Sequence, residues 1–127
     1  MANALLGLQL YTLREALERD YAGTIEKVAT AGYAGVESAG FPGSSLEEAK
    51  SLYDKHGLVV SSAHAEPPVG EQEERVIENA QALGITRLVG GQSRENYVSL
   101  DLVKRACALF NRAAQHEHVH GMTLSKH

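Results

Sequence analysis

A repeated joint between helix-like and strand-like segments constrains the fold of this chain more than any other feature. Four times, an amphipathic helical pattern ends in a glycine and an apolar run follows, at Gly32, Gly57, Gly84 and Gly121. A glycine just past a helix end adopts the left-handed conformation that closes the helix. Together with a first strand expected over Leu6–Tyr11, these joints predict the order β-α-β-α-β-α-β-α-β.

The residue pattern inside these segments predicts a parallel α/β fold. Each helical segment carries one apolar stripe, and the helix after Ser45 opens with a capping box that Glu48 completes. The strand segments are apolar or small on both faces, which is typical of a parallel sheet covered by helices. The periodicity is compatible with two architectures: a doubly wound open sheet, or a barrel segment with all helices outside.

Composition bounds the class of protein. A chain of 127 residues is long enough for one domain with a core, expected over residues 1–127. A formal net charge of -4 disfavours a nucleic-acid partner, and no apolar run approaches the ~20 residues of a membrane span. The single cysteine, Cys107, excludes an internal disulfide and predicts a cytoplasmic protein. Because Cys107 lies on an apolar helical face, we expect it to be an inert core residue.

The stretch Leu58–Pro68 reads LVVSSAHAEPP and is predicted to be a buried strand that two prolines stop. Its polar groups fall at the carboxyl end, where parallel α/β folds place ligand sites. In an extended segment His64 and Glu66 point to one face and can take part in proton transfer. The alternative is that His64 hydrogen-bonds the backbone and Glu66 lies in solvent.

Three further polar residues fall on the first two predicted strands. Gln9 and Tyr11 share a face of the first strand, and Glu37 ends the second. A carboxylate on a buried sheet must be paired or face a cleft, so Glu37 is a candidate pocket residue. Arg14, just beyond Tyr11, can meet a phosphate. The alternatives are a surface carboxylate at Glu37, a core aromatic at Tyr11 and a solvated Arg14.

The segment HEHVHG at 116–121 is the most unusual stretch in composition. His116 and His120 would share a helical face and could hold a metal ion, whereas on a strand all three histidines of the segment would align. The other interpretation, which we favour from the sequence, is a solvated helix tail.

Four stretches in chain order resemble the xylose isomerase-like TIM-barrel superfamily, which includes sugar phosphate isomerases and epimerases. They are GLQLYTLR at 7–14, GYAGVESAG at 32–40, SSAHAE at 61–66 and LGITRLV at 83–89. The resemblance implies a sugar or sugar phosphate as substrate. It also implies that the residues lining the substrate pocket are Gln9, Tyr11, Glu37, His64 and Glu66.

The resemblance covers only part of a barrel. A complete TIM barrel has eight strands and about 250 residues, so we expect this chain to form a (βα)4-β half with its helices on the outer face. In complete family members a divalent metal is held by residues of the later strands, and we expect this chain alone to bind none. His127 falls where the first histidine of a family His-Asn-His-type motif would lie. It joins His116 and His120 as a weak candidate metal ligand.

Two functions remain open from the sequence. One is metal-dependent isomerisation or epimerisation of a sugar or sugar phosphate, to which this chain contributes pocket walls. The other is a half-barrel without turnover of its own. A flavodoxin-like binding domain is disfavoured because no nucleotide fingerprint occurs. Since the two outer strands of a half-barrel would expose unpaired edges, we expect a homodimer or higher homo-oligomer.

Overall fold

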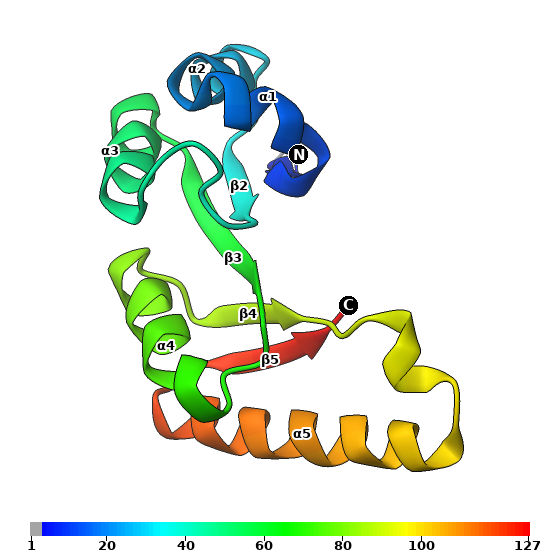
Figure 1. Cartoon of the computed structure of the whole chain (residues 1–127). Coiled ribbons are helices and arrows are strands. Elements are labelled where there is room, and N and C mark those ends of the chain that lie inside the picture. Colours follow the sequence, from blue (N-terminus) through cyan, green and yellow to red (C-terminus); the bar gives the residue numbers. More distant parts are fainter. Residues whose placement is uncertain (1–3) are drawn as a thin grey trace. The chain divides into compact units, whose positions relative to one another are not determined.

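Strands and helices alternate along the chain in a computed structural model that describes residues 4–127, apart from the side chain of Val119. The residues fall into two compact units, Met1–Ala63 and His64–His127, and each is described by itself (Figure 1). The expectation of a single domain over residues 1–127 stays a prediction. No helix in the described range combines the length and the apolar character that crossing a membrane requires.

The first unit is a parallel sheet with its connecting helices (Figure 1). Its strands pair in chain order, and they are β1 (Gly7–Gln9), β2 (Gly35–Ser38) and β3 (Val59–Ala65). The connection from β1 to β2 comprises a 3₁₀ helix, η1 (Leu10–Leu13), and the helices α1 (Arg14–Arg19) and α2 (Tyr21–Thr30). The connection from β2 to β3 contains α3 (Leu46–His56).

The second unit repeats this plan. Its strands β4 (Arg87–Gly90) and β5 (Thr123–Lys126) are parallel neighbours. Before β4 come η2 (Gly70–Gln72) and α4 (Glu73–Ala82), and between the two strands lie η3 (Arg94–Tyr97) and the long helix α5 (Leu100–Val119). The expected order and the parallel α/β class are therefore confirmed.

The four glycine joints form as the sequence predicts. Gly32, Gly57, Gly84 and Gly121 all have positive φ, between 67° and 92°. After α3, the Leu58 amide donates to the Tyr53 carbonyl oxygen at 2.9 Å, which is the six-to-one bond of a Schellman motif. The expected cap of α3 is also present, because the Ser45 hydroxyl accepts a hydrogen bond from the Glu48 amide at 3.2 Å.

Two expectations for the first connection are wrong. The strand predicted over Leu6–Tyr11 is only three residues long, because the chain turns into η1 at Leu10 and places that side chain in the core, 1% exposed. The helical segment that follows is two helices rather than one. Asp20 interrupts it and caps α2, since its carboxylate accepts a hydrogen bond from the Gly23 amide at 2.9 Å.

The strand expected to be buried along Leu58–Pro68 is buried only in part. Ser62 and Ala63 are buried, but Val59 is 67% exposed. Val59 stands opposite Gly35 in the β2–β3 register, and glycine has no side chain to cover it. The buried side chains of the first unit come instead from the helices and β2, and include Leu17, Ile25, Val28, Val36, Ala49 and Tyr53.

Candidate functional site

A hydrogen-bonded carboxylate lies near the carboxyl ends of the strands of the first unit. Glu37 on β2 stands opposite Gln9 on β1 and Ser62 on β3 in the strand register. The Gln9 side-chain amide donates to Glu37 Oε1 at 2.6 Å, and the Ser62 hydroxyl donates to Glu37 Oε2 at 2.6 Å. Each carboxylate oxygen is thus held from a different neighbouring strand. We name Gln9, Glu37 and Ser62 the Glu37 network.

An irregularity in β3 builds this network. The register runs from Val36 opposite Val60 to Glu37 opposite Ser62, so Ser61 is an extra residue on β3. Such a bulge redirects the side chains that follow it, and here Ser62 comes to face Glu37. Ser61 itself donates to the Val36 carbonyl oxygen at 3.3 Å. Sequence reasoning missed Ser62 because nothing in the pattern SSAHAE marks the register shift.

Tyr11 does not join Gln9. Because η1 begins at Leu10, Tyr11 leaves the strand and is 54% exposed. The Arg14 guanidinium lies 4.7 Å from the centre of the Tyr11 ring and donates to the Tyr11 carbonyl oxygen at 3.2 Å. The expectation that Gln9 and Tyr11 share a strand face is therefore wrong. The role of Tyr11 in substrate binding stays a prediction.

The second unit brings together two histidines that are far apart in the sequence. The His64 ring at the end of β3 and the His127 ring after β5 meet edge to face, with their centroids 5.5 Å apart. The His127 amide donates to the Gly90 carbonyl oxygen at 2.7 Å, which fixes the end of β5 beside β4. Glu66 lies beyond the end of β3 and is exposed. Two imidazoles at strand ends form a candidate site for proton transfer.

The donor set does not fit a complete divalent-metal site of the kind the family implies. Within residues 4–127 no three side chains of His, Cys, Asp or Glu are placed to hold one ion. Both oxygens of Glu37 are engaged by Gln9 and Ser62. We therefore derive no catalytic step through a metal held by these residues.

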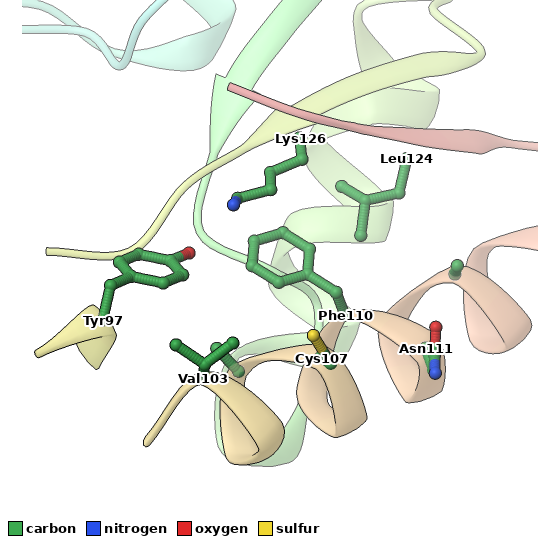
Figure 2. Close-up of a pocket in the computed structure, with 9 residues that line it drawn as sticks. Tyr97, Val103, Cys107, Phe110, Asn111, Leu124 and Lys126 are labelled. Atoms are coloured by element: carbon green, nitrogen blue, oxygen red, sulfur yellow. The ribbon is translucent and has the colours of Figure 1, made fainter. Parts of the chain in front are cut away.

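An apolar groove runs along α5 in the second unit (Figure 2). It has a volume of about 350 Å³ and is lined by Val103, Cys107, Phe110 and Leu124, among others, with Tyr97 and Lys126 at one end. The Lys126 ammonium lies 4.5 Å from the centre of the Tyr97 ring. The expectation that Cys107 is a core residue is wrong: its helical face is apolar as expected, but it lines this open groove and is exposed.

The histidine segment belongs to α5 up to Val119. His116 Nε2 lies 2.6 Å from Glu73 Oε1 on α4. The neighbouring Glu117 is 0% exposed, and within the described residues neither of its carboxylate oxygens has a hydrogen-bond partner. Burial raises the pKa of the Glu117 carboxyl to about 7. The favoured interpretation of a solvated helix tail thus agrees with the exposed His118 and His120, but it is wrong for the buried Glu117.

The order of strands and helices is that of one part of a TIM barrel. A sugar phosphate isomerase/epimerase from Parabacteroides distasonis is similar to the whole chain, with a TM-score of 0.70 and 24% identity. An AP endonuclease of family 2 from Brucella melitensis matches 98% of the chain with a TM-score of 0.74 and 15% identity. A xylose isomerase-like TIM-barrel protein from Mycobacterium smegmatis, in complex with magnesium, matches 96% with a TM-score of 0.62 and 16% identity.

The chain spans about half the length of these solved structures, namely 52%, 55% and 54% of them in the same order. The predicted half-barrel fold is thus confirmed. No protein-family model and no curated protein sequence matches the chain. At these identities the likeness shows the fold.

Proposed function

We propose that this chain supplies the substrate-binding wall of an isomerase or epimerase that acts on a sugar or sugar phosphate. The observation that carries the proposal is the Glu37 network. A carboxylate fixed by two donors from neighbouring strands is an oriented acceptor whose remaining lone pairs can receive sugar hydroxyls. Among the solved structures that share the fold, the Parabacteroides distasonis protein is described as a sugar phosphate isomerase/epimerase.

A divalent metal in the working enzyme would be held by residues outside this chain, since the described residues lack a three-ligand group. His64 and His127 would move protons, since their two rings meet at strand ends with centroids 5.5 Å apart. A cytoplasmic location accords with the exposed free thiol of Cys107, which favours a reducing compartment.

Glu37→Gln tests this function directly. The variant keeps the size of the side chain and removes the charge. We therefore expect turnover of the accepted sugar to fall roughly tenfold to hundredfold, which corresponds to the free energy of one hydrogen bond to a charged acceptor. The assay follows isomerisation and epimerisation of a panel of sugars and sugar phosphates with added divalent metal. Glu47→Gln, on the exposed first turn of α3, is the matched control and should retain full activity.

A contaminating host enzyme would give turnover that is equal in wild type and Glu37→Gln. Equal rates, or no turnover on any member of the panel, would exclude the catalytic assignment. The second candidate function would then stand: a half-barrel that assembles without turnover of its own.

This second candidate is favoured by the apolar groove along α5 (Figure 2). Within the described residues, β5 has a hydrogen-bonded neighbour, β4, on one side, and the groove lies beside it with Leu124 in its lining. We propose that a second copy of this chain covers the groove and the free edge.

Phe110→Glu tests the self-association. A charge placed in an apolar contact resists desolvation, so we expect the wild-type chain to be a dimer or larger at micromolar concentration and the variant to be a monomer. Static light scattering on size-exclusion fractions measures the mass. Arg112→Glu, on an exposed position of the same helix outside the groove lining, should leave the assembly intact. A monomeric wild type would contradict the proposal.

A further inference from the structure

The carboxyl-terminal end of α5 carries two histidines beside an acidic hollow of the second unit. His116 and His120 lie one helical turn apart, and their ring centroids are 5.0 Å from each other. The hollow has a volume of about 310 Å³, and both histidines line it together with Glu73, Glu74, Glu78 and Gln81 of α4. This end of α5 leads into β5, whereas His127 follows β5. The pair is therefore separate from the His64–His127 site.

One of the two imidazoles is already oriented. His116 Nε2 lies 2.6 Å from Glu73 Oε1, and both side chains are 34% exposed. A carboxylate oxygen this close to Nε2 favours the tautomer with its proton on that nitrogen, so that the lone pair of Nδ1 is left for another partner. Metal-ligating histidines commonly have a carboxylate beside their other ring nitrogen, which orients the ring.

We propose that His116 and His120 bind one first-row transition-metal cation, of the class of Cu²⁺, Ni²⁺ or Zn²⁺. The imidazole nitrogens are the protein ligands, and water completes the coordination, since no three His, Cys, Asp or Glu side chains are gathered around one point within residues 4–127. Imidazole suits these borderline cations better than it suits Mg²⁺ or Ca²⁺, which prefer oxygen. Glu73 acts as a positioning residue through His116, and Glu74 and Glu78 make the hollow favourable to a cation.

A metal ion held by residues four apart also ties two turns of the helix together. Binding should therefore stabilise the end of α5 and raise the melting temperature of the chain, because the ion binds the folded state and not the unfolded one. The proposal concerns this helix end only, and it holds whether or not the chain turns over a sugar.

The test uses the untagged chain, titrated with the chlorides of Cu²⁺, Ni²⁺, Zn²⁺ and Mg²⁺ while heat of binding and melting temperature are recorded. We expect one ion per chain, affinity falling from Cu²⁺ to Ni²⁺ and Zn²⁺, and no response to Mg²⁺. His116→Ala and His120→Ala should each weaken Zn²⁺ binding at least about tenfold. His118→Ala is the matched control, because this exposed histidine lies between them in sequence but does not line the hollow.

Two variants, Glu73→Ala and Glu73→Gln, test whether Glu73 orients His116 for metal binding or only supports the fold. Alanine should weaken binding about tenfold, whereas glutamine keeps a side-chain oxygen beside His116 Nε2 and should restore most of it. Circular dichroism shows whether each variant is folded, and His116→Gln replaces His116→Ala if the latter is not. Binding that is lost equally in His118→Ala, or that survives in both His116→Ala and His120→Ala, overturns the proposal, as does the absence of binding at millimolar metal.

Discussion

We expect the ionisation of one buried carboxyl, Glu117, to lower the free energy of unfolding by about 3 kcal/mol as the pH rises from 4.5 to 8. The side chain is 0% exposed, and burial raises its pKa from 4.5 to about 7. Below pH 4.5 the group is neutral in both the folded and the unfolded chain. Between these two pKa values the unfolded chain loses its proton first, so unfolding is favoured increasingly until the folded chain ionises as well.

Glu117→Gln measures this contribution. Glutamine is neutral at every pH, so the variant should lack the decline and gain about 3 kcal/mol over the wild type between pH 4.5 and pH 8. Urea unfolding of both chains over this range gives a difference curve in which the other titrating groups cancel. Glu26→Gln, an exposed change on α2, should give a flat difference curve. A flat curve for Glu117→Gln would show that Glu117 is ionised at little cost in the folded chain.

A methyl group added at Gly35 should destabilise the first unit by about 3 kcal/mol, the upper end of what overpacking costs. A Cβ at this position would clash with the Val59 carbonyl oxygen, and backbone of the neighbouring strand cannot swing aside as a flexible side chain can. β2 and β3 would have to separate. Their register places Ser62 opposite Glu37, so the Glu37 network should loosen together with the pairing.

Gly7→Ala is the matched control for Gly35→Ala. Gly7 also lies in a strand of the same sheet, but a Cβ there would meet the nearest atom, the Gly35 carbonyl oxygen, at an ordinary 3.6 Å. Since alanine loses less backbone entropy than glycine in a strand, this variant should be neutral or more stable by up to about 1 kcal/mol. Urea unfolding at pH 7 measures both. Equal stabilities of the two variants would contradict the close approach of β2 and β3 at Gly35.

The alternation of elements was predictable because its determinants are local. Glycine at each helix end and the capping serine before α3 act within a few residues of themselves, and all of them form as expected. The early end of β1 was not predictable, because Leu10 leaves the strand to reach a core assembled from distant segments. The break at Asp20 depends on a local cap, and an aspartate three residues before Gly23 was a signal that could have revealed it.

The sequence predicted which types of residue form the candidate site, but not which of them hydrogen-bond to one another. Gln9 and Glu37 were expected to be polar residues at strand ends, and the strand register pairs them. Ser62 joins them only because of the extra residue at Ser61, which is a property of two strands together. The burial of Glu117 within a histidine-rich segment was likewise not predictable. The sequence of this helix end does not show which of its faces other segments cover.

The most direct test of the proposed sugar-binding wall is a titration of the ¹⁵N-labelled wild-type chain with a panel of sugars and sugar phosphates, followed by ¹H–¹⁵N correlation spectra. We expect saturable shifts of the Gln9 side-chain amide and of the Glu37 and Ser62 backbone amides for the accepted ligand, because these groups hold or lie beside the carboxylate that receives its hydroxyls. Saturable binding that leaves these resonances unmoved, or no binding by any member of the panel, would contradict it.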